Sequence, residues 1–368
     1  MMLSHPLMRG TWDLSDAGGW DALSPRRGRI ALAIAMGVLG TAAERPVHAE
    51  TPRDTPTAIE VDRDTAPAGR AGFGFDGGEP VDAWGASISA GWIERPIRLG
   101  SDAFGTGSPA TDPVRRRETI SLGGALALGD SVVIDVGIRA SHQVGDRLRA
   151  AGDPEGLARY VFHDVRFGGR IRVAGNGDRA ALLRADLTLP SGNADQFAGD
   201  ARWTAAWSLI GRASLPHDVV VAANAGVRLH GAEVAIGDRL IGDELFAAAG
   251  VAVPIPPVGS LLGLAEPLKL TGELAGSLGD HVGMRSGPDP LEARLGVIVR
   301  PLPELTFAAR AGFGLDQQIG APSVRGVLAV AWTPQAPRRA EPATPSSPPL
   351  PASPVPDDDP DDDSEGTR

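Results

Sequence analysis

Several segments of the chain carry charged side chains at every second position. Arg170 and Arg172 show this spacing, and so do Arg184 and Asp186. Side chains two residues apart in an extended strand point to the same face. A face lined with guanidinium groups attracts anions, which are either solutes or carboxylates of the same protein. The spacing therefore predicts a charged sheet face whose chemistry is electrostatic binding.

The same parity, followed through every alternating segment, gives a set of twelve basic and five acidic residues. The set is Asp135, Arg139, Asp164, Arg166, Arg170, Arg172, Arg184, Asp186, Arg202, Arg212, Arg228, Lys269, Glu273, Glu292, Arg294, Arg310 and Arg325. A lumen lined in this way favours anionic solutes, because a ring of arginines lowers the energy of an anion in a narrow aqueous pore.

A second interpretation is that these charges pair with one another and fill the lumen as a stabilising network. Asp164 is then the candidate partner of Arg184, and Asp186 is the candidate partner of Arg170. The excess of arginine tilts any open pore toward anions. The sequence leaves the open and the filled lumen as alternatives.

Nucleophilic catalysis and metal binding are the other chemistries that we considered. Ser141 and His142 are adjacent, but neighbouring strand residues point to opposite faces and cannot act as nucleophile and base. Four further histidines lack the spacing of metal ligands; they are His163, His217, His230 and His281. The chain has no cysteine, which excludes disulfides and thiolate metal sites. We expect neither an enzyme nor a cofactor.

Strands are the elements that must position the charged face. In residues 125–141, ALALGDSVVIDVGIRAS, Ile134 belongs to an apolar parity, whereas Asp135 and Arg139 belong to the other. Alternation with period two indicates a strand, and Gly129-Asp130 between two such runs indicates a hairpin. The unit recurs and predicts twelve strands near residues 83–95, 118–128, 131–142, 161–173, 179–189, 201–214, 218–230, 243–253, 267–278, 291–300, 304–315 and 323–333.

The connections alternate between short and long along this series. Short links such as Gly129-Asp130 follow strands two, four, six and ten, whereas residues 96–117 and 143–160 form long polar links. An even number of strands with this alternation is typical of bacterial outer-membrane barrels, which have short periplasmic turns and longer outer loops. The link at residues 254–266, about a dozen residues on the short side, is the exception.

A soluble β-sandwich or lipocalin-like barrel is the competing fold. Its oily parity would face a core of large side chains and its charged parity would face water. Here the polar parity is rich in Gly, Ala and Ser as well as Arg, and a crowded lumen explains small residues where a solvated face does not. We therefore predict an all-β fold, a transmembrane antiparallel up-and-down β-barrel of about twelve strands with disordered termini.

Aromatic residues mark the two expected membrane interfaces. Trp84 begins the first strand and Trp332 ends the last, so a closed barrel places both at the periplasmic rim. Trp92, Trp203 and Tyr160 fall at the opposite ends of their strands. Aromatic girdles are typical of this class, although these are sparse.

The remaining regions define the domain organisation. Residues 1–49 form a signal peptide with an overlong start, because three arginines precede the apolar run Ile30 to Ala43 and small residues end it at Ala49. Residues 50–80 form a flexible lead without periodicity, and its GFGFDGG run lacks the pattern of a phosphate loop. Residues 81–333 are the barrel. Residues 334–368 are a Pro-rich and acidic disordered tail.

The order of signal, barrel, Pro-rich stretch and Asp-rich run Asp357 to Asp363 resembles the OmpA-like outer-membrane proteins of Gram-negative bacteria. In that family the linker leads to a peptidoglycan-binding domain. The sequence given ends at Arg368 without that domain, so we do not carry cell-wall binding over. Residues 187–200, LTLPSGNADQFAGD, also resemble the strand and loop of outer-membrane transporters.

These observations give two candidate functions and a location. The first function is a passive channel for small, anionic solutes, and the alternative is a structural outer-membrane protein with a plugged lumen. We expect the bacterial outer membrane with both termini in the periplasm. The expected partners are outer-membrane lipids and the barrel-insertion machinery. The net charge of −11 argues against nucleic acid.

Overall fold

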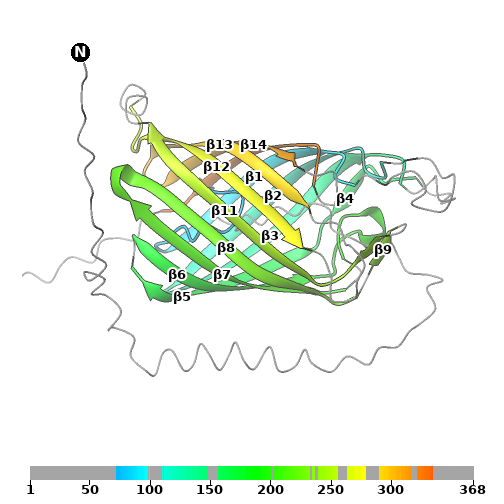
Figure 1. The fold of residues 1–368 in the computed structure, drawn as a ribbon, viewed down its shortest axis with the longest axis horizontal. Coiled ribbons are helices and arrows are strands. Elements are labelled where there is room, and N and C mark those ends of the chain that lie inside the picture. The colour runs from blue at the N-terminus through cyan, green and yellow to red at the C-terminus, as the bar shows by residue number, and fades with distance from the viewer. Residues whose placement is uncertain are drawn as a thin grey trace, which may run out of the picture. The chain divides into compact units, whose positions relative to one another are not determined.

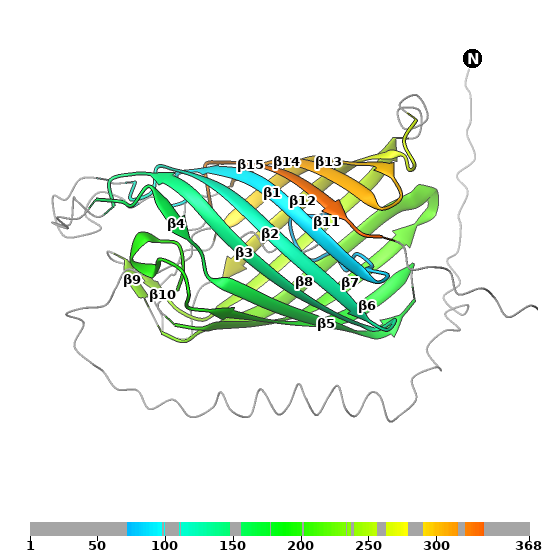
Figure 2. The same cartoon turned by 180° about the vertical axis from the view of Figure 1, so that it is seen from behind.

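The computed structural model shows a closed antiparallel β-barrel (Figures 1 and 2). It describes residues 72–97, 99, 110, 112–147, 156–176, 178–200, 202–232, 234–236, 239–255, 263–278, 290–315 and 321–334. The expected signal peptide, the beginning of the lead and nearly all of the expected tail lie outside these residues.

The described residues form fifteen strands, and twelve of them make up the barrel wall. The wall strands are β1 (Trp84–Glu94), β2 (Arg116–Leu128), β3 (Val132–Val144), β5 (Val165–Gly175), β6 (Arg179–Leu189), β7 (Thr204–Leu215), β8 (Val219–His230), β11 (Glu244–Ile255), β12 (Leu268–Leu278), β13 (Leu291–Leu302), β14 (Leu305–Gly314) and β15 (Val324–Trp332). The shorter elements are β4 (Tyr160–Phe162), β9 (Val234–Ile236), β10 (Arg239–Ile241) and the 3₁₀ turns Ala194–Gln196 and Pro216–Asp218.

Pairing between the first and the last strand closes the barrel. β1 is antiparallel to β15 with Ala86 opposite Trp332, and each other wall strand pairs with its two neighbours in chain order. This up-and-down order needs only hairpin links. Closure removes the free sheet edges that an open sheet would expose. The predicted fold class is confirmed.

Alternating burial separates the two faces of the wall. Outward residues are apolar and exposed, as for Ile120 at 58%, Leu209 at 58% and Leu295 at 67%. Their inward neighbours are buried and include charged residues such as Asp135 at 5%. A continuous exposed apolar belt around a charged interior is the pattern of a barrel whose outer surface contacts lipid.

The strand bounds follow the prediction closely, with two departures. His163 and Asp164 interrupt the predicted strand 161–173, so that β4 and β5 pair with different parts of β3. The hairpin of β9 and β10 was not predicted, and it lies in the link between β8 and β11. Among the described residues no helix is long and apolar enough to cross a membrane.

The largest difference concerns residues 72–82, which we assigned mostly to a flexible lead. They lie inside the ring of strands, where Figure 1 shows the blue segment before β1. Phe75 is 0% exposed and Asp76 is 1% exposed. Residues 72–82 are called the lumen segment below. The assignment as a flexible lead is wrong for residues 72–80, because apolar and ionic contacts with the wall hold them.

Candidate functional site

The two phenylalanines of the lumen segment pack against one part of the barrel wall. The rings of Phe73 and Phe75 are stacked with their centroids 5.1 Å apart. They pack on small inward residues of β8 and β11, which are Val220, Ala222, Ala248 and Ala252. A Cβ atom built at Gly250 of β11 would lie 2.9 Å from the Phe73 ring. Small residues on this wall therefore make room for the segment.

On one side the segment meets a cluster of ion pairs centred on Arg184 of β6. Arg184 donates to Asp135 from Nη1 at 2.9 Å and from Nη2 at 3.0 Å. Its Nε donates to Asp186 at 2.8 Å and its Nη1 donates to Asp76 at 2.9 Å. Because Asp135, Asp76 and Arg184 are almost fully buried, these are charge-assisted bonds in a largely water-excluded place.

Asp76 of the lumen segment also binds Arg170 of β5. Nη1 of Arg170 donates to Oδ1 of Asp76 at 2.9 Å, and Nη2 donates to the Glu79 carbonyl. The Gly78 amide donates to the same Oδ1 at 3.0 Å, in a turn where Gly78 has a φ of 75°. Both oxygens of the Asp76 carboxylate therefore accept hydrogen bonds from arginine. We call Asp76, Asp135, Arg166, Arg170, Arg184 and Asp186 the Arg184 cluster.

On the other side the segment meets Arg294 of β13. Arg294 donates to both oxygens of Glu292, at 2.9 and 3.0 Å, and its Nη1 donates to the Gly74 carbonyl at 2.9 Å. The Gly74 amide donates to Glu273 at 2.9 Å. Arg325 also donates to Glu292 at 2.9 Å. We call Glu273, Glu292, Arg294 and Arg325 the Arg294 cluster.

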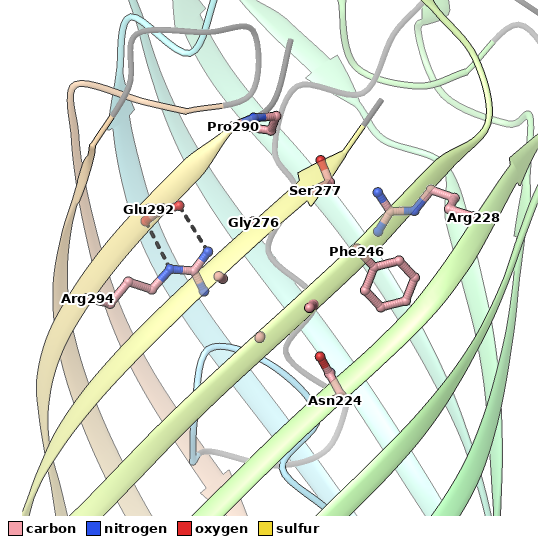
Figure 3. A pocket seen from close by; sticks show the side chains of 11 residues that line it. Asn224, Arg228, Phe246, Gly276, Ser277, Pro290, Glu292 and Arg294 are labelled. Atoms are coloured by element: carbon pink, nitrogen blue, oxygen red, sulfur yellow. Dashed lines mark hydrogen bonds and ion pairs between the residues drawn. The ribbon is translucent and has the colours of Figure 1, made fainter. Parts of the chain in front are cut away.

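Two small cavities lie along the inner face of the wall. One has a volume of about 50 Å³, and Figure 3 shows Arg294 and Glu292 on one side of it, with Arg228 and Phe246 on the other. The guanidinium of Arg228 lies 5.2 Å from the Phe246 ring centroid, and it pairs with Glu244. The second cavity, about 40 Å³, lies next to Arg212, Arg300 and Lys269. Both volumes are of the size that holds a few water molecules.

The structure places most of the predicted charged residues on the inward face. Some of these residues are buried, namely Asp135, Arg170, Arg184, Glu273, Glu292, Arg294, Arg310 and Arg325. Others are half-buried, namely Arg139, Arg166, Arg172, Asp186, Arg212, Arg228 and Lys269. Arg310 reaches the Gly72 carbonyl of the lumen segment.

Two members of the predicted set do not line the lumen. Arg202 is exposed before β7 begins. Asp164 is buried, but its carboxylate accepts from the amides of Ser191, Gly192 and Asp200, at 2.9, 2.7 and 2.7 Å. Asp164 therefore orders the 190–200 loop, because a loop that folds back needs partners for its amides.

The two candidate ion pairs are also different from those expected. Arg184 pairs with Asp135, Asp186 and Asp76, and not with Asp164. Arg170 pairs with Asp76, while Asp186 lies near Arg166 at 4.0 Å. The expected pairs considered wall residues alone. The lumen segment supplies the carboxylate that the wall lacks.

A buried polar network lies under the 190–200 loop at the long-loop rim. Arg117 of β2 donates to the Gln143 side chain at 2.6 Å and to the Phe197 carbonyl at 2.7 Å. Ser141 is 2.6 Å from His163 and 2.7 Å from Thr119. Ser141 thus contacts His163 and not its neighbour His142, because His163 interrupts the strand.

The aromatic residues lie on the outer face near the strand ends. Trp84 and Trp332 are 5.9 Å apart between ring centroids, at the rim where β1 begins and β15 ends. Trp92, Trp203 and Tyr160 are all exposed. No group of three or more His, Asp or Glu residues within the described part of the chain could hold a metal ion.

Several residues of the site were missed by sequence reasoning. Asp76 lies in a segment without periodicity, and Glu244 begins β11 next to the predicted strand start. Arg117 lies just before the predicted start of strand two and belongs to β2. The sequence Phe-Gly-Phe-Asp at residues 73–76 was the available signal for a segment bound inside the barrel. Its two aromatic residues suit an apolar part of the wall, and the carboxylate that follows suits a basic part.

Comparisons with known proteins support the fold. No family model matches the chain, and no curated protein sequence matches it. A solved outer membrane channel from Pseudomonas putida F1 is 13% identical with a TM-score of 0.50, and the match covers 72% of this chain and 99% of that one. At this identity the likeness shows the fold of an outer-membrane β-barrel.

Two porins are similar at lower scores. The KdgM porin is 8% identical with a TM-score of 0.41, covering 68% of this chain and 99% of that one. The NanC porin is 6% identical with a TM-score of 0.44, covering 67% of this chain and 98% of that one.

Proposed function

We propose that the protein is a passive outer-membrane channel for small solutes, with a preference for anions, and that its own lumen segment narrows the pore. The observation that carries this proposal is the inward face of the wall, where arginines from β5, β6, β13 and β14 contact residues 72–79. The exposed apolar belt on the outer face supports a position in a bilayer.

The wall chemistry favours a channel over a wholly solid interior. A wall built only for packing would fill the lumen with large apolar side chains, whereas this one presents Gly, Ala, Ser and Arg. Arg172 and Arg212 are half-buried and point into the lumen. Arginines in a dry interior are costly unless each is paired, so water at these positions is the less costly arrangement.

Location and partners belong to the same proposal. The chain is inserted in the bacterial outer membrane with its termini in the periplasm, by the barrel-insertion machinery, and it contacts lipid through its belt. The short links from β2 to β3 and from β5 to β6 lie at the rim where β1 begins, which supports a periplasmic position for that rim. The OmpA-like character of residues 334–368, a periplasmic linker, is part of this proposal.

A structural role with a plugged lumen is the second candidate, and the lumen segment favours it. Wall residues bind the backbone or side chains of residues 72, 74, 76 and 79. A fixed segment of this kind would leave little room for solute flow. The two functions differ in whether ions cross the purified protein.

Liposome swelling and ion conductance test the proposal. The full-length mature protein is reconstituted into liposomes containing sugars of graded size and, separately, into planar bilayers. A channel gives swelling that falls as the sugar grows, together with stepwise conductance. A folded, heat-modifiable barrel that gives neither swelling nor conductance would support the structural role instead.

A further inference from the structure

We propose that Arg170 and Arg184 form a binding site for a carboxylate group, which Asp76 occupies as an intramolecular ligand. A soluble carboxylate competes with Asp76 for this site. The inference deepens the proposed function and rests on it, because it names carboxylate-bearing anions as the solutes that the lumen recognises.

The strand register places the two arginines against each other. In the pairing of β5 with β6, Arg170 lies directly opposite Arg184. Like charges directly opposite on neighbouring strands are destabilising. The arrangement persists because an anion lies between the two side chains. In the structure that anion is the Asp76 carboxylate, with one oxygen 2.9 Å from Arg170 and the other 2.9 Å from Arg184.

The wall preorganises the Arg184 half of the site, whereas the contacts of Arg170 are with the lumen segment. Asp135 and Asp186 hold the Arg184 guanidinium through four hydrogen bonds. Gly168 of β5 leaves space for the Asp135 carboxylate that binds Arg184, since a Cβ atom at Gly168 would lie 2.6 Å from that carboxylate. An orientation fixed in advance reduces the free-energy cost of binding a ligand. A carboxylate that replaced Asp76 would find Arg184 already in place.

Burial makes the site selective for an anion. The side chains of Arg170 and Arg184 are 2% and 4% exposed. A buried guanidinium that loses its ionic partner is strongly destabilised, so removal of Asp76 makes the binding of another anion favourable. Each arginine donates one hydrogen bond to a different oxygen of the Asp76 carboxylate. A planar group with two acceptor oxygens, such as a carboxylate, fits this arrangement.

The ligand and the wall are separable parts of the protein. Asp76 belongs to the lumen segment, which is not a wall strand. Residues 77–83 connect Asp76 to the start of β1. Contacts of Phe73 and Phe75 with β8 and β11 hold it independently of the arginines. Substitution of Asp76 therefore empties the site without removing a strand from the barrel.

Acetate is the test ligand, because it reproduces the Asp side-chain carboxylate. The full-length purified protein in detergent is titrated with sodium acetate by calorimetry, with ionic strength held constant by chloride. We expect Asp76→Ala to bind acetate at least tenfold more tightly than the wild type, in which Asp76 blocks the site. Asp76→Asn, which keeps the side-chain shape, gives an intermediate affinity and serves if the alanine variant fails to fold.

Two matched variants show whether the arginine pair is responsible. Glu79→Gln removes a carboxylate from the same segment but leaves Asp76 in place, so it should bind acetate as weakly as the wild type. The double variant D76A/R170Q should lose the acetate binding gained by D76A. Equal acetate binding by all five proteins, or no acetate binding by D76A and D76N, would overturn the proposal.

Calorimetry in detergent does not depend on ion flow, so the two proposals fail separately. Conductance without acetate binding by the Asp76 variants would exclude the carboxylate site but not the channel function. Acetate binding without conductance at any voltage removes the channel and with it the assignment of carboxylates as transported solutes.

Discussion

The two charged clusters of the lumen hold the same segment in different ways. In the Arg294 cluster the wall supplies the carboxylate, because Glu292 binds both Arg294 and Arg325, and the segment contributes the peptide groups of Gly74. In the Arg184 cluster the wall supplies Asp135 and Asp186, and the segment adds the carboxylate of Asp76. One cluster forms its ion pairs within the wall, whereas the other completes them with the segment.

This difference separates the contact that we propose for anion recognition from a contact that holds the segment. Peptide groups exist in any segment, so the Arg294 cluster could hold many sequences. A carboxylate between two opposed arginines requires an acidic residue at one position. In our proposal the Arg184 cluster is therefore the place where an anionic solute competes with the lumen segment, and the Arg294 cluster is a structural anchor.

Arg184→Gln should give the largest loss of stability. The change leaves Asp76, Asp135 and Asp186 without their shared arginine, and breaking a buried ion pair from one side costs about 3–5 kcal/mol. The free energy of unfolding is measured by urea titration in lipid vesicles. Arg294→Gln is the matched control and should cost less, because Glu292 keeps Arg325. Equal losses would erase the distinction between the clusters.

Ile134→Arg tests whether the clusters share one inward face. Ile134 is 44% exposed and adjoins the buried Asp135, so the two residues point to opposite sides of β3. An arginine on the lipid face costs about 2–4 kcal/mol at the bilayer midplane and about 0–1 kcal/mol near the interfaces. Because Ile134 is the third residue of β3, we expect a loss between these two ranges. Leu187→Arg on β6 should give a similar loss in the same unfolding assay. Values near zero at both positions would place these faces in water.

Gly250→Ala should loosen the apolar hold on the segment without altering either cluster. The added methyl group would lie 2.9 Å from the Phe73 ring and 3.1 Å from Phe75. Overpacking of this kind costs about 1–3 kcal/mol. Proteolysis of the reconstituted barrel should then cut the segment faster than in the wild type, whereas Ala249→Gly, on the outward face, should leave the rate unchanged. Identical cleavage rates in G250A and wild type would contradict the packing described.

Asp146→Asn should have the smallest effect and sets the scale for the buried pairs. Asp146 lies 3.3 Å from Arg115, and the two side chains are 59% and 56% exposed. Exposed pairs contribute about 0–1 kcal/mol because water and salt screen them. We expect a change in unfolding free energy below about 0.5 kcal/mol. A loss as large as that of R294Q would show that exposure does not govern the strength of these pairs.

The wall could be read from the sequence because each strand carries its own signal. The period of two gave the inward parity of Arg170 and Arg184, and the predicted bounds 179–189 match β6. The interruption at His163 and Asp164 was missed, because both residues fit the alternation and only the folded 190–200 loop gives Asp164 its amide partners.

The contents of the lumen could not be read in the same way. The partners of the lumen segment are distant in the chain: Asp76 and Arg170 differ by 94 in residue number, and Gly74 and Glu273 differ by 199. No local pattern encodes such contacts. The alternation shows that a charged side chain points inward but does not identify its partner. For this reason the prediction that Arg184 pairs with Asp164 was wrong.

Anion selectivity is measured by the reversal potential of the purified full-length protein in planar bilayers under a potassium chloride gradient. We expect a potential of the sign that an anion-selective pore gives. Arg172→Glu with Arg212→Glu should shift it toward cations, because both side chains face the lumen and neither holds Asp76. A cation-selective wild type, or a folded protein that conducts no current at any salt concentration, would contradict the account.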